Sequence, residues 1–214
     1  AGARSEKGQA RRRMTGIRAV TVSASSAAAP AAVGEPRPSS AARTPSGWLR
    51  WLPLLLAAAY FCVMMPIGSQ LILHYPDERH YAYGGARMVE TGDWLIPYTP
   101  AGEIRLKKPV IPYWFSAAGF EVLGIGVPGF RLFWVLAASG ILLFTYAIAR
   151  GLGAPPAIAL LGQVILAANP VFMRAATNAI PDIPLTFFVA MAALGFVRVL
   201  AAGPGEPTGR WAWL

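Results

Sequence analysis

Residues 51–76 read WLPLLLAAAYFCVMMPIGSQLILHYP and contain no Asp, Glu, Lys or Arg. A transmembrane helix needs about 20 predominantly apolar residues to cross the hydrocarbon core of a bilayer. Trp51 near one end and His74 near the other are residue types that suit the membrane interface. The stretch therefore predicts a first membrane span over about residues 48–73.

The composition of the chain agrees with a membrane protein. Of its 214 residues, 55% are hydrophobic and 14% are charged, and the mean hydropathy is +0.47. Soluble domains are about 45–50% apolar and about 25% charged. Intrinsic disorder is excluded for most of the chain because disordered segments are poor in apolar residues. The single cysteine, Cys62, excludes an internal disulfide and any zinc or redox motif that needs several cysteines.

Two more uncharged stretches, residues 132–149 and 151–173, are long enough to cross a bilayer, and a third, residues 183–197, is long enough with its flanks. The pattern predicts an all-α membrane protein with about four transmembrane helices. The later spans are expected at about residues 131–150, 154–176 and 182–201. Residues 110–123 are apolar but short and contain Pro112, which indicates an interfacial helix rather than a span. Residues 203–214 have the pattern of a cytoplasmic turn followed by the start of a further apolar segment.

The positive charge is concentrated at the N-terminus. Residues 1–47 carry eight basic and two acidic side chains, which is +6 of the formal net charge of +9. Their composition indicates a disordered tail, and they lack the apolar core of a secretory signal. Basic residues favour the cytoplasmic side of a first span, so we expect a cytoplasmic N-terminus and an outer loop at 74–130. No folded basic face with interleaved aromatic residues is visible, so no nucleic-acid partner is expected.

The outer loop carries the densest cluster of charged side chains. The carboxylates Asp77 and Glu78 come first, and the cations Arg105, Lys107 and Lys108 follow. A carboxylate beside a partly dehydrated cleft can act as a general base. Nearby cations can bind a phosphate and stabilise charge that develops on a leaving oxygen. The combination favours transfer of a group from a lipid phosphate.

Simpler roles remain open for the same residues. Asp77 could cap a helix of the loop, Glu78 could complement its dipole, and Asp182 could cap the fourth span. His74, Asp77, Glu78 and His80 could instead bind a divalent metal, since residues three apart share a helix face. The sequence leaves a divalent metal open as a cofactor and assigns none.

Five short motifs follow one another within the outer loop. They are DERHYA at 77–82, ARM at 86–88, GDW at 92–94, KP at 108–109 and YW at 113–114. In this order they resemble the first outer loop of the lipid-A aminoarabinose transferases and the related dolichyl-phosphate-mannose–protein mannosyltransferases. The resemblance covers residues 48 to about 202 and implies the N-terminal part of a GT-C type helical bundle. Such enzymes move a sugar from a polyprenyl-phosphate donor to a lipid, protein or glycan acceptor.

The resemblance also implies roles for particular residues. Asp77 would be the leading catalytic carboxylate, and Glu78 would orient it or contact the acceptor. Asp182, at the start of the fourth span, would be the second acid of the cleft. Lys108 would bind the donor phosphate, with help from Arg105 or Lys107.

Two further positions bear on the comparison with this family. Arg131 lies where the family places an arginine, at the start of the second span. The aminoarabinose enzymes commonly carry Glu immediately before the Lys-Pro pair, whereas this chain has Lys107, so the sugar and the acceptor stay open. The resemblance implies a multi-pass protein of the inner (plasma) membrane, in contact with membrane lipid and a polyprenyl-phosphate-linked sugar. Its site would face the periplasm or exterior.

The chain begins with Ala1, and members of the resembled family are much longer. We therefore expect a truncated N-terminal portion, which could be an inactive membrane fragment when taken alone. The alternative from another class is a transporter or other lipid-handling membrane protein. Transport sites usually lie near the bilayer midplane, and no charged residue lies in the middle of an expected span.

Overall fold

The computed structural model describes residues 47, 49–70 and 76–202. In this part of the chain, the only β pairing is an isolated antiparallel bridge between Tyr98 and Ile104. The elements are a short 3-10 helix η1 (Leu49–Trp51), α1 (Leu52–Gln70), α2 (Pro76–Thr91), α3 (Ile111–Leu123), α4 (Val127–Gly151), α5 (Pro156–Ala167), α6 (Pro170–Thr177) and α7 (Asp182–Ala201). The expected all-α fold is confirmed.

Three expectations fall wholly or partly outside the described residues. These are the basic tail up to residue 46, the end of the first span with His74, and the C-terminal turn at 203–214. The described portion of the first span is η1 followed by α1.

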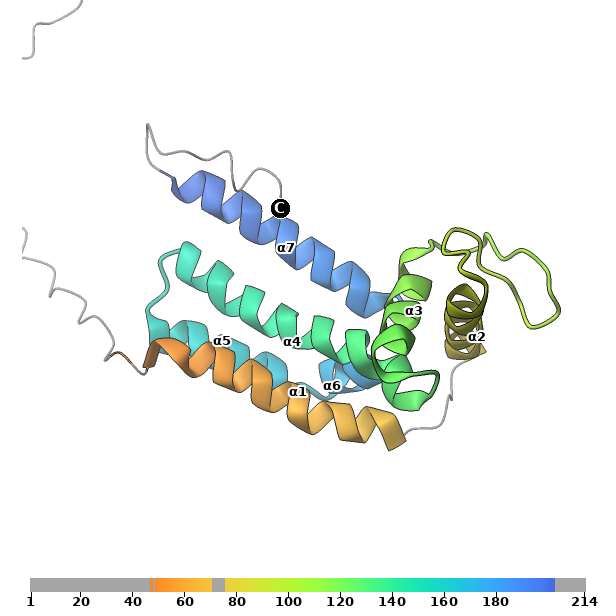
Figure 1. Cartoon of the computed structure of the whole chain (residues 1–214). Helices are drawn as coiled ribbons and strands as arrows, with labels where there is room; N and C mark the ends of the chain where they lie inside the picture. Colours follow the sequence, from red (N-terminus) through yellow and green to blue (C-terminus); the bar gives the residue numbers. More distant parts are fainter. Residues whose placement is uncertain (1–46, 48, 71–75, 203–214) are drawn as a thin grey trace, which may run out of the picture. The chain divides into compact units, whose positions relative to one another are not determined.

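Three helices of the described residues are long and apolar enough to cross a bilayer: α1, α4 and α7. The helices α5 and α6 meet at an angle of 63° and provide a fourth crossing if they are counted as one bent span. Helices α1, α3, α5 and α7 all contact α4, and Figure 1 shows α1, α4 and α7 side by side. The structure is therefore a helical membrane bundle of three or four spans built around α4.

The third expected span is bent rather than continuous. The uncharged run is continuous here, but the helix is interrupted at Ala168 and Asn169, between α5 and α6. The Asn169 side chain accepts hydrogen bonds from the backbone N–H groups of Val171 at 2.9 Å and Phe172 at 3.1 Å. Pro170, which has no N–H to donate, is the first residue of α6. This N-cap starts a new helix inside the apolar run because it satisfies the first N–H groups locally.

Helices α2 and α3 lie across one end of the bundle, at a steep angle to α4 (Figure 1). Helix α3 has 13 residues, too few to cross a bilayer. The two helices approach closely at the glycine pair of α2. A β-carbon at Gly84 would lie 2.5 Å from the Tyr113 ring, and one at Gly85 would lie 2.6 Å from the β-carbon of Ser116. The pair thus brings the charged loop helix and α3 into direct contact.

Buried side chains form two apolar clusters. The first lies among the spanning helices and includes Tyr60, Val135 and Ile141. The second lies at the end of the bundle where α2 and α3 meet α4, and its members include Tyr81 and Trp134. The second cluster supports the side chains of the candidate site.

Candidate active site

The two catalytic acids expected from the sequence lie at helix starts. Asp77 is in the first turn of α2, and Asp182 is the first residue of α7. Tyr81 lies one turn beyond Asp77 on α2, and burial together with the negative charges of both carboxylates raises the pKa of its phenol. Burial, followed by the negative charge of Asp77 and more weakly that of Asp182, raises the pKa of Tyr81 to about 12. The two acids are distant in sequence, and the hydrogen bond from the backbone N–H of Ala179 to Glu78 holds the segment before Asp182 next to the start of α2.

Arg105 connects the loop after α2 to this acid cluster. Its Nη2 donates to Asp77 Oδ1 at 3.4 Å, and its Nε donates to the hydroxyl of Tyr113 at 3.1 Å. The Asp77 side chain is 45% exposed and that of Arg105 is 14% exposed. The carboxylate of Asp77 is therefore charge-compensated on one side and accessible on the other.

Lys107 and Lys108 are exposed at the end of the same loop, just before α3. Among the described residues neither ammonium group forms an ion pair with a carboxylate. Of the three cations expected to bind phosphate, the structure joins only Arg105 to Asp77. Of these three cations, the two lysines are therefore the ones without a carboxylate partner in the described part of the chain.

Glu78 differs from its neighbour because it is buried. Its side chain is 1% exposed, and Oε1 accepts a hydrogen bond from Arg131 Nη1 at 2.5 Å. The same oxygen accepts the backbone N–H of Ala179 at 2.7 Å. The structure thus places Glu78 in the packing between α2, α4 and the turn before α7.

Two buried tyrosines belong to the site and were missed as site residues in the sequence. The rings of Tyr81 and Tyr113 meet edge to face with centroids 5.1 Å apart. Burial raises the pKa of Tyr113 although the hydrogen bond from Arg105 lowers it. Both phenols are therefore neutral near pH 7 and can donate hydrogen bonds. Tyr81 could have been found, because residues four apart on a helix lie on the same face and Asp77 was already a candidate. Tyr113 could not, because its Tyr-Trp-Phe run is typical of aromatic residues at the membrane interface.

The residues considered for a metal do not form a centre in the described part of the chain. No group of three or more His, Cys, Asp or Glu side chains is close enough there to hold a metal ion. His74, one of the four residues considered, lies outside the described residues. Glu78 is engaged by Arg131 and Ala179.

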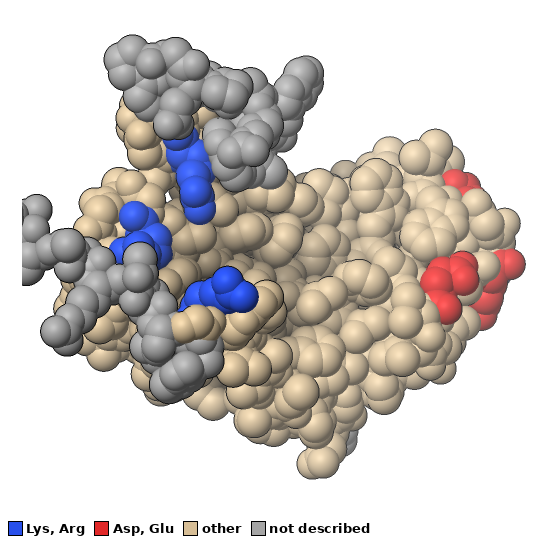
Figure 2. Space-filling model, turned by 60° about the vertical axis from the view of Figure 1, so that its left-hand side comes forward, with Lys and Arg blue, Asp and Glu red and all other residues tan. Residues whose placement is uncertain are grey.

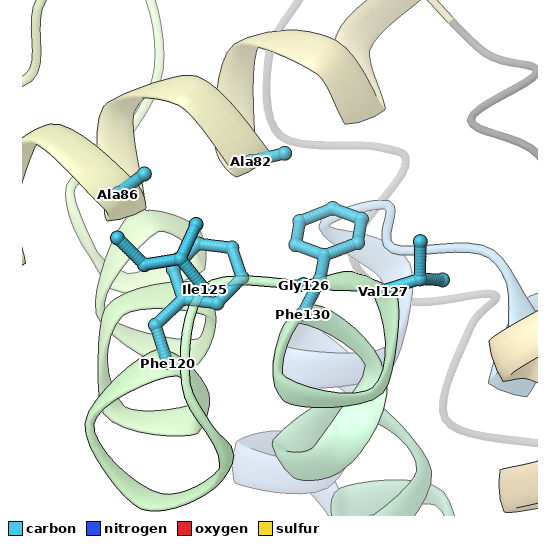
Figure 3. A pocket seen from close by; sticks show the side chains of 7 residues that line it. All are labelled: Ala82, Ala86, Phe120, Ile125, Gly126, Val127 and Phe130. Carbon is cyan, nitrogen blue, oxygen red and sulfur yellow. The ribbon is translucent and has the colours of Figure 1, made fainter.

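An apolar cavity of about 200 Å³ lies beneath α2 (Figure 3). Ala82 and Ala86 point into it from α2, opposite Phe120 of α3 and Phe130 of α4. Residues 125–127 of the α3–α4 connection close one side. The small side chains one turn apart on α2 leave this space open. Its lining can accept a hydrocarbon group next to the charged end of α2.

Residues 48–214 match the family described as dolichyl-phosphate-mannose-protein mannosyltransferase. A protein of Aquifex aeolicus (strain VF5), named only as uncharacterized, is 32% identical over 142 residues, which cover 62% of this chain and 28% of that protein. The undecaprenyl phosphate-alpha-4-amino-4-deoxy-L-arabinose arabinosyl transferase of Aeromonas salmonicida (strain A449) is 36% identical over 76 residues, covering 35% of this chain and 13% of the enzyme.

Among solved structures, ArnT from Cupriavidus metallidurans bound to undecaprenyl phosphate has a similar fold. The TM-score is 0.63 at 23% sequence identity, over 79% of this chain and 30% of that chain. The apo structure of the same protein gives the same TM-score. The chain therefore spans less than a third of the length of these relatives.

Proposed function

Because the chain belongs to the dolichyl-phosphate-mannose-protein mannosyltransferase family, we propose that it acts in a membrane glycosyltransferase with a polyprenyl-phosphate sugar donor. The acceptor is a hydroxyl or phosphate of a lipid, protein or glycan. The observation that carries the proposal is the contact of Asp77 with Arg105 at the end of the bundle, where the hydrogen bond from Ala179 to Glu78 holds the segment before Asp182 against α2. The names of the arabinosyl transferase relatives and the lipid phosphate bound to ArnT support this donor class.

Asp77 is proposed as the general base. An acceptor oxygen attacks the anomeric carbon of the sugar, and its proton passes to the Asp77 carboxylate. The bond from the anomeric carbon to the phosphate oxygen breaks, and its electron pair leaves with the polyprenyl phosphate. The half-exposed Asp77 can reach an acceptor, while Asp182 is proposed as the second acid that orients the acceptor.

The leaving phosphate needs positive charge, and we assign that task mainly to Lys107 and Lys108. Their ammonium groups are exposed and are unpaired with carboxylates among the described residues. Arg105 is already shared between Asp77 and Tyr113, so it contributes as a partly neutralised cation. Charge-assisted hydrogen bonds to phosphate are about twice as strong as neutral ones. The apolar cavity under α2 offers space for part of a lipid chain.

We further propose that this end of the bundle faces the periplasm or exterior of the inner (plasma) membrane. Arg50, Arg150 and Arg198 lie at the start of α1 and the ends of α4 and α7. On the face shown in Figure 2, the visible basic side chains lie at one end and the visible acidic side chains at the other, while Arg105, Lys107 and Lys108 belong to the acidic end. Basic residues flanking spans favour the cytoplasmic side. The basic tail 1–47 then lies in the cytoplasm, and residues 48–202 form the N-terminal part of the transmembrane domain.

The test is transfer from a radiolabelled polyprenyl-phosphate sugar in membranes that contain the protein. Asp77→Asn is expected to abolish transfer while leaving membrane insertion intact. Glu90→Gln, an exposed carboxylate on the same helix, is the matched control and should keep activity. Transfer by the Asp77→Asn variant would contradict the general base. Movement of the donor across the membrane without transfer would instead favour a transporter.

A further inference from the structure

We propose that Arg131 is a positioning residue: through Glu78 it holds the start of α2 against the turn before α7, and so fixes the spacing between Asp77 and Asp182. The catalytic meaning of this spacing rests on the proposed function. The structural claim is that the buried carboxylate of Glu78, held by Arg131, joins the start of α2 to the turn before α7, and it can be tested without the proposed function.

A single carboxylate oxygen joins the segments. Glu78 Oε1 accepts a hydrogen bond from Arg131 Nη1 at 2.5 Å and another from the backbone N–H of Ala179 at 2.7 Å. Glu78 directly follows Asp77, and Ala179 lies three residues before Asp182. The Glu78 carboxylate thus ties together two chain segments, one next to Asp77 and the other three residues before Asp182.

Arg131 is the fixed point of this arrangement. Its side chain is fully buried near the start of α4, with its guanidinium 5.1 Å from the centre of the Phe130 ring. A β-carbon at Gly68 of α1 would lie 3.7 Å from both Arg131 Cγ and Thr177 Cγ2 of α6. Arg131 therefore stands where α1, α4 and α6 meet, and from there it reaches Glu78 on α2.

The charge of Arg131 makes the contact with Glu78 obligatory. A buried cation is costly unless it is paired and hydrogen-bonded. Among the described residues, the Nε and Nη2 groups of Arg131 have no hydrogen-bond partner. Glu78 therefore neutralises the charge of Arg131, and because Arg131 is fixed, the Glu78 carboxylate is held in one place. Asp77 and Asp182 need no contact with each other to keep a constant separation.

The test measures the distance between α2 and α7 in the chain reconstituted in lipid nanodiscs. With Cys62 replaced by alanine, spin labels are attached at Glu90→Cys on α2 and Leu185→Cys on α7, both exposed positions. The parent should give one narrow distance peak by pulsed electron resonance. Arg131→Met should lose that narrow peak, and Arg131→Lys, which keeps the cation, should retain more of it.

A double variant separates positioning from stability. Glu78→Leu with Arg131→Met removes both charges, so no unpaired buried charge remains, and such replacements are often neutral for folding. We expect it to fold and still to lose the narrow α2–α7 peak. A second label pair, Leu136→Cys on α4 with Leu185→Cys, should stay narrow in every variant. A narrow α2–α7 peak in the double variant, or equal broadening of both pairs, overturns the proposal.

A matched control and an activity readout complete the design. Glu121→Gln changes an exposed carboxylate on α3 and should leave both distances unchanged. In the transfer assay, the double variant should lower kcat by roughly 100-fold with little change in the donor KM, as expected for misplaced catalytic groups. An unchanged kcat overturns the catalytic part of the proposal. Absence of transfer in the parent would contradict the proposed function and leave the distance result standing.

Discussion

Asp77 and Glu78 are adjacent acids in the first turn of α2, yet they lie in opposite surroundings. Consecutive residues of an α-helix point about 100° apart, so one can face outward while the other faces the packing. Asp77 keeps nearly half of its side chain exposed and shares Arg105 with Tyr113. Glu78 is buried and accepts hydrogen bonds from Arg131 and from the backbone of Ala179. This difference in accessibility supports the proposed chemical role of Asp77 and the proposed positioning role of Glu78.

Binding of the donor phosphate should depend most on Lys108, which has no carboxylate partner among the described residues. Lys108→Ala is expected to raise the KM for the polyprenyl-phosphate sugar about 10- to 100-fold, the loss of one charge-assisted hydrogen bond of about 1.5–3 kcal/mol. The value of kcat should fall as well, because the same ammonium group would stabilise the charge that develops on the leaving phosphate. Donor titrations in detergent measure both constants. Arg87→Ala, an exposed cation on α2, serves as control, and an unchanged donor KM for Lys108→Ala would refute the phosphate role.

Tyr81 should make the fold sensitive to alkali. Its pKa is raised to about 12 in the folded protein, above the usual tyrosine value of 10.0, so its stabilising contribution is complete below pH 10. That contribution is lost as the pH rises from about 10 to 12, because the unfolded chain releases the proton first. Unfolding midpoints measured across this range should fall less steeply in Tyr81→Phe than in the parent. An equally steep fall of the unfolding midpoint with pH in the parent and in Tyr81→Phe would contradict a raised pKa for this phenol. Tyr83→Phe, on the same helix, is the control.

Helix α2 shows how packing can override local propensity. Its glycine pair lowers the intrinsic stability of an isolated helix. In the structure the same pair allows α3 to approach, and a β-carbon at Gly85 would lie 3.0 Å from the backbone nitrogen of Ala117. A backbone atom cannot move aside as a flexible side chain can. The absence of side chains at this pair is therefore part of how the loop helix docks on α3.

Gly85→Ala is accordingly expected to destabilise the protein although alanine is the better helix former. Overpacking of this kind costs about 1–3 kcal/mol, against roughly 1 kcal/mol gained in propensity. Gly162→Ala on α5 is the matched control, since a β-carbon there meets nothing within 4 Å. Thermal unfolding in detergent should show a lower midpoint for Gly85→Ala alone. A midpoint at or above that of the parent would show that α2 and α3 are not in close contact.

The helical elements differ in how far the sequence could predict them. Length and hydropathy alone predict α1, α4 and α7, since crossing a bilayer sets a minimum apolar run. The bend between α5 and α6 was missed because hydropathy is uniformly high along this uncharged run and does not show where a helix inside it ends. Asn169 followed by Pro170 is a recognisable helix start, and could have located it.

In the site, the sequence could single out the charged residues but not their partners. Adjacent acids at a helix start have the same local pattern, and only tertiary contacts with Arg131 and Ala179 separate Glu78 from Asp77. The pairing of Arg105 with Asp77 joins positions far apart along the chain, which no local spacing encodes. The roles assigned to these residues remain predictions for the assays described above.

On the scale of the whole molecule, the path of α5 and α6 determines which side each loop faces. Helix α5 begins near the end of α4, and α7 begins at the opposite end of the bundle, beside α3 (Figure 1). The bond from Ala179 to Glu78 independently places the start of α7 next to α2. The bent pair therefore travels the length of the bundle, from which we expect the described chain to cross the membrane four times rather than three.

This path predicts the result of topology reporters fused at chain turns. A reporter that is active only after export should be active when fused after Pro181, before α7, and inactive when fused after Gly153, between α4 and α5. The Gly153 fusion is the matched control because it follows Arg150 at the basic end of the bundle. Both sites active, or both inactive, would mean that α5 and α6 turn back without crossing. The reverse pattern would place Asp77 and Asp182 in the cytoplasm and contradict an extracytoplasmic site, because both acids lie at the end of the bundle opposite Arg150.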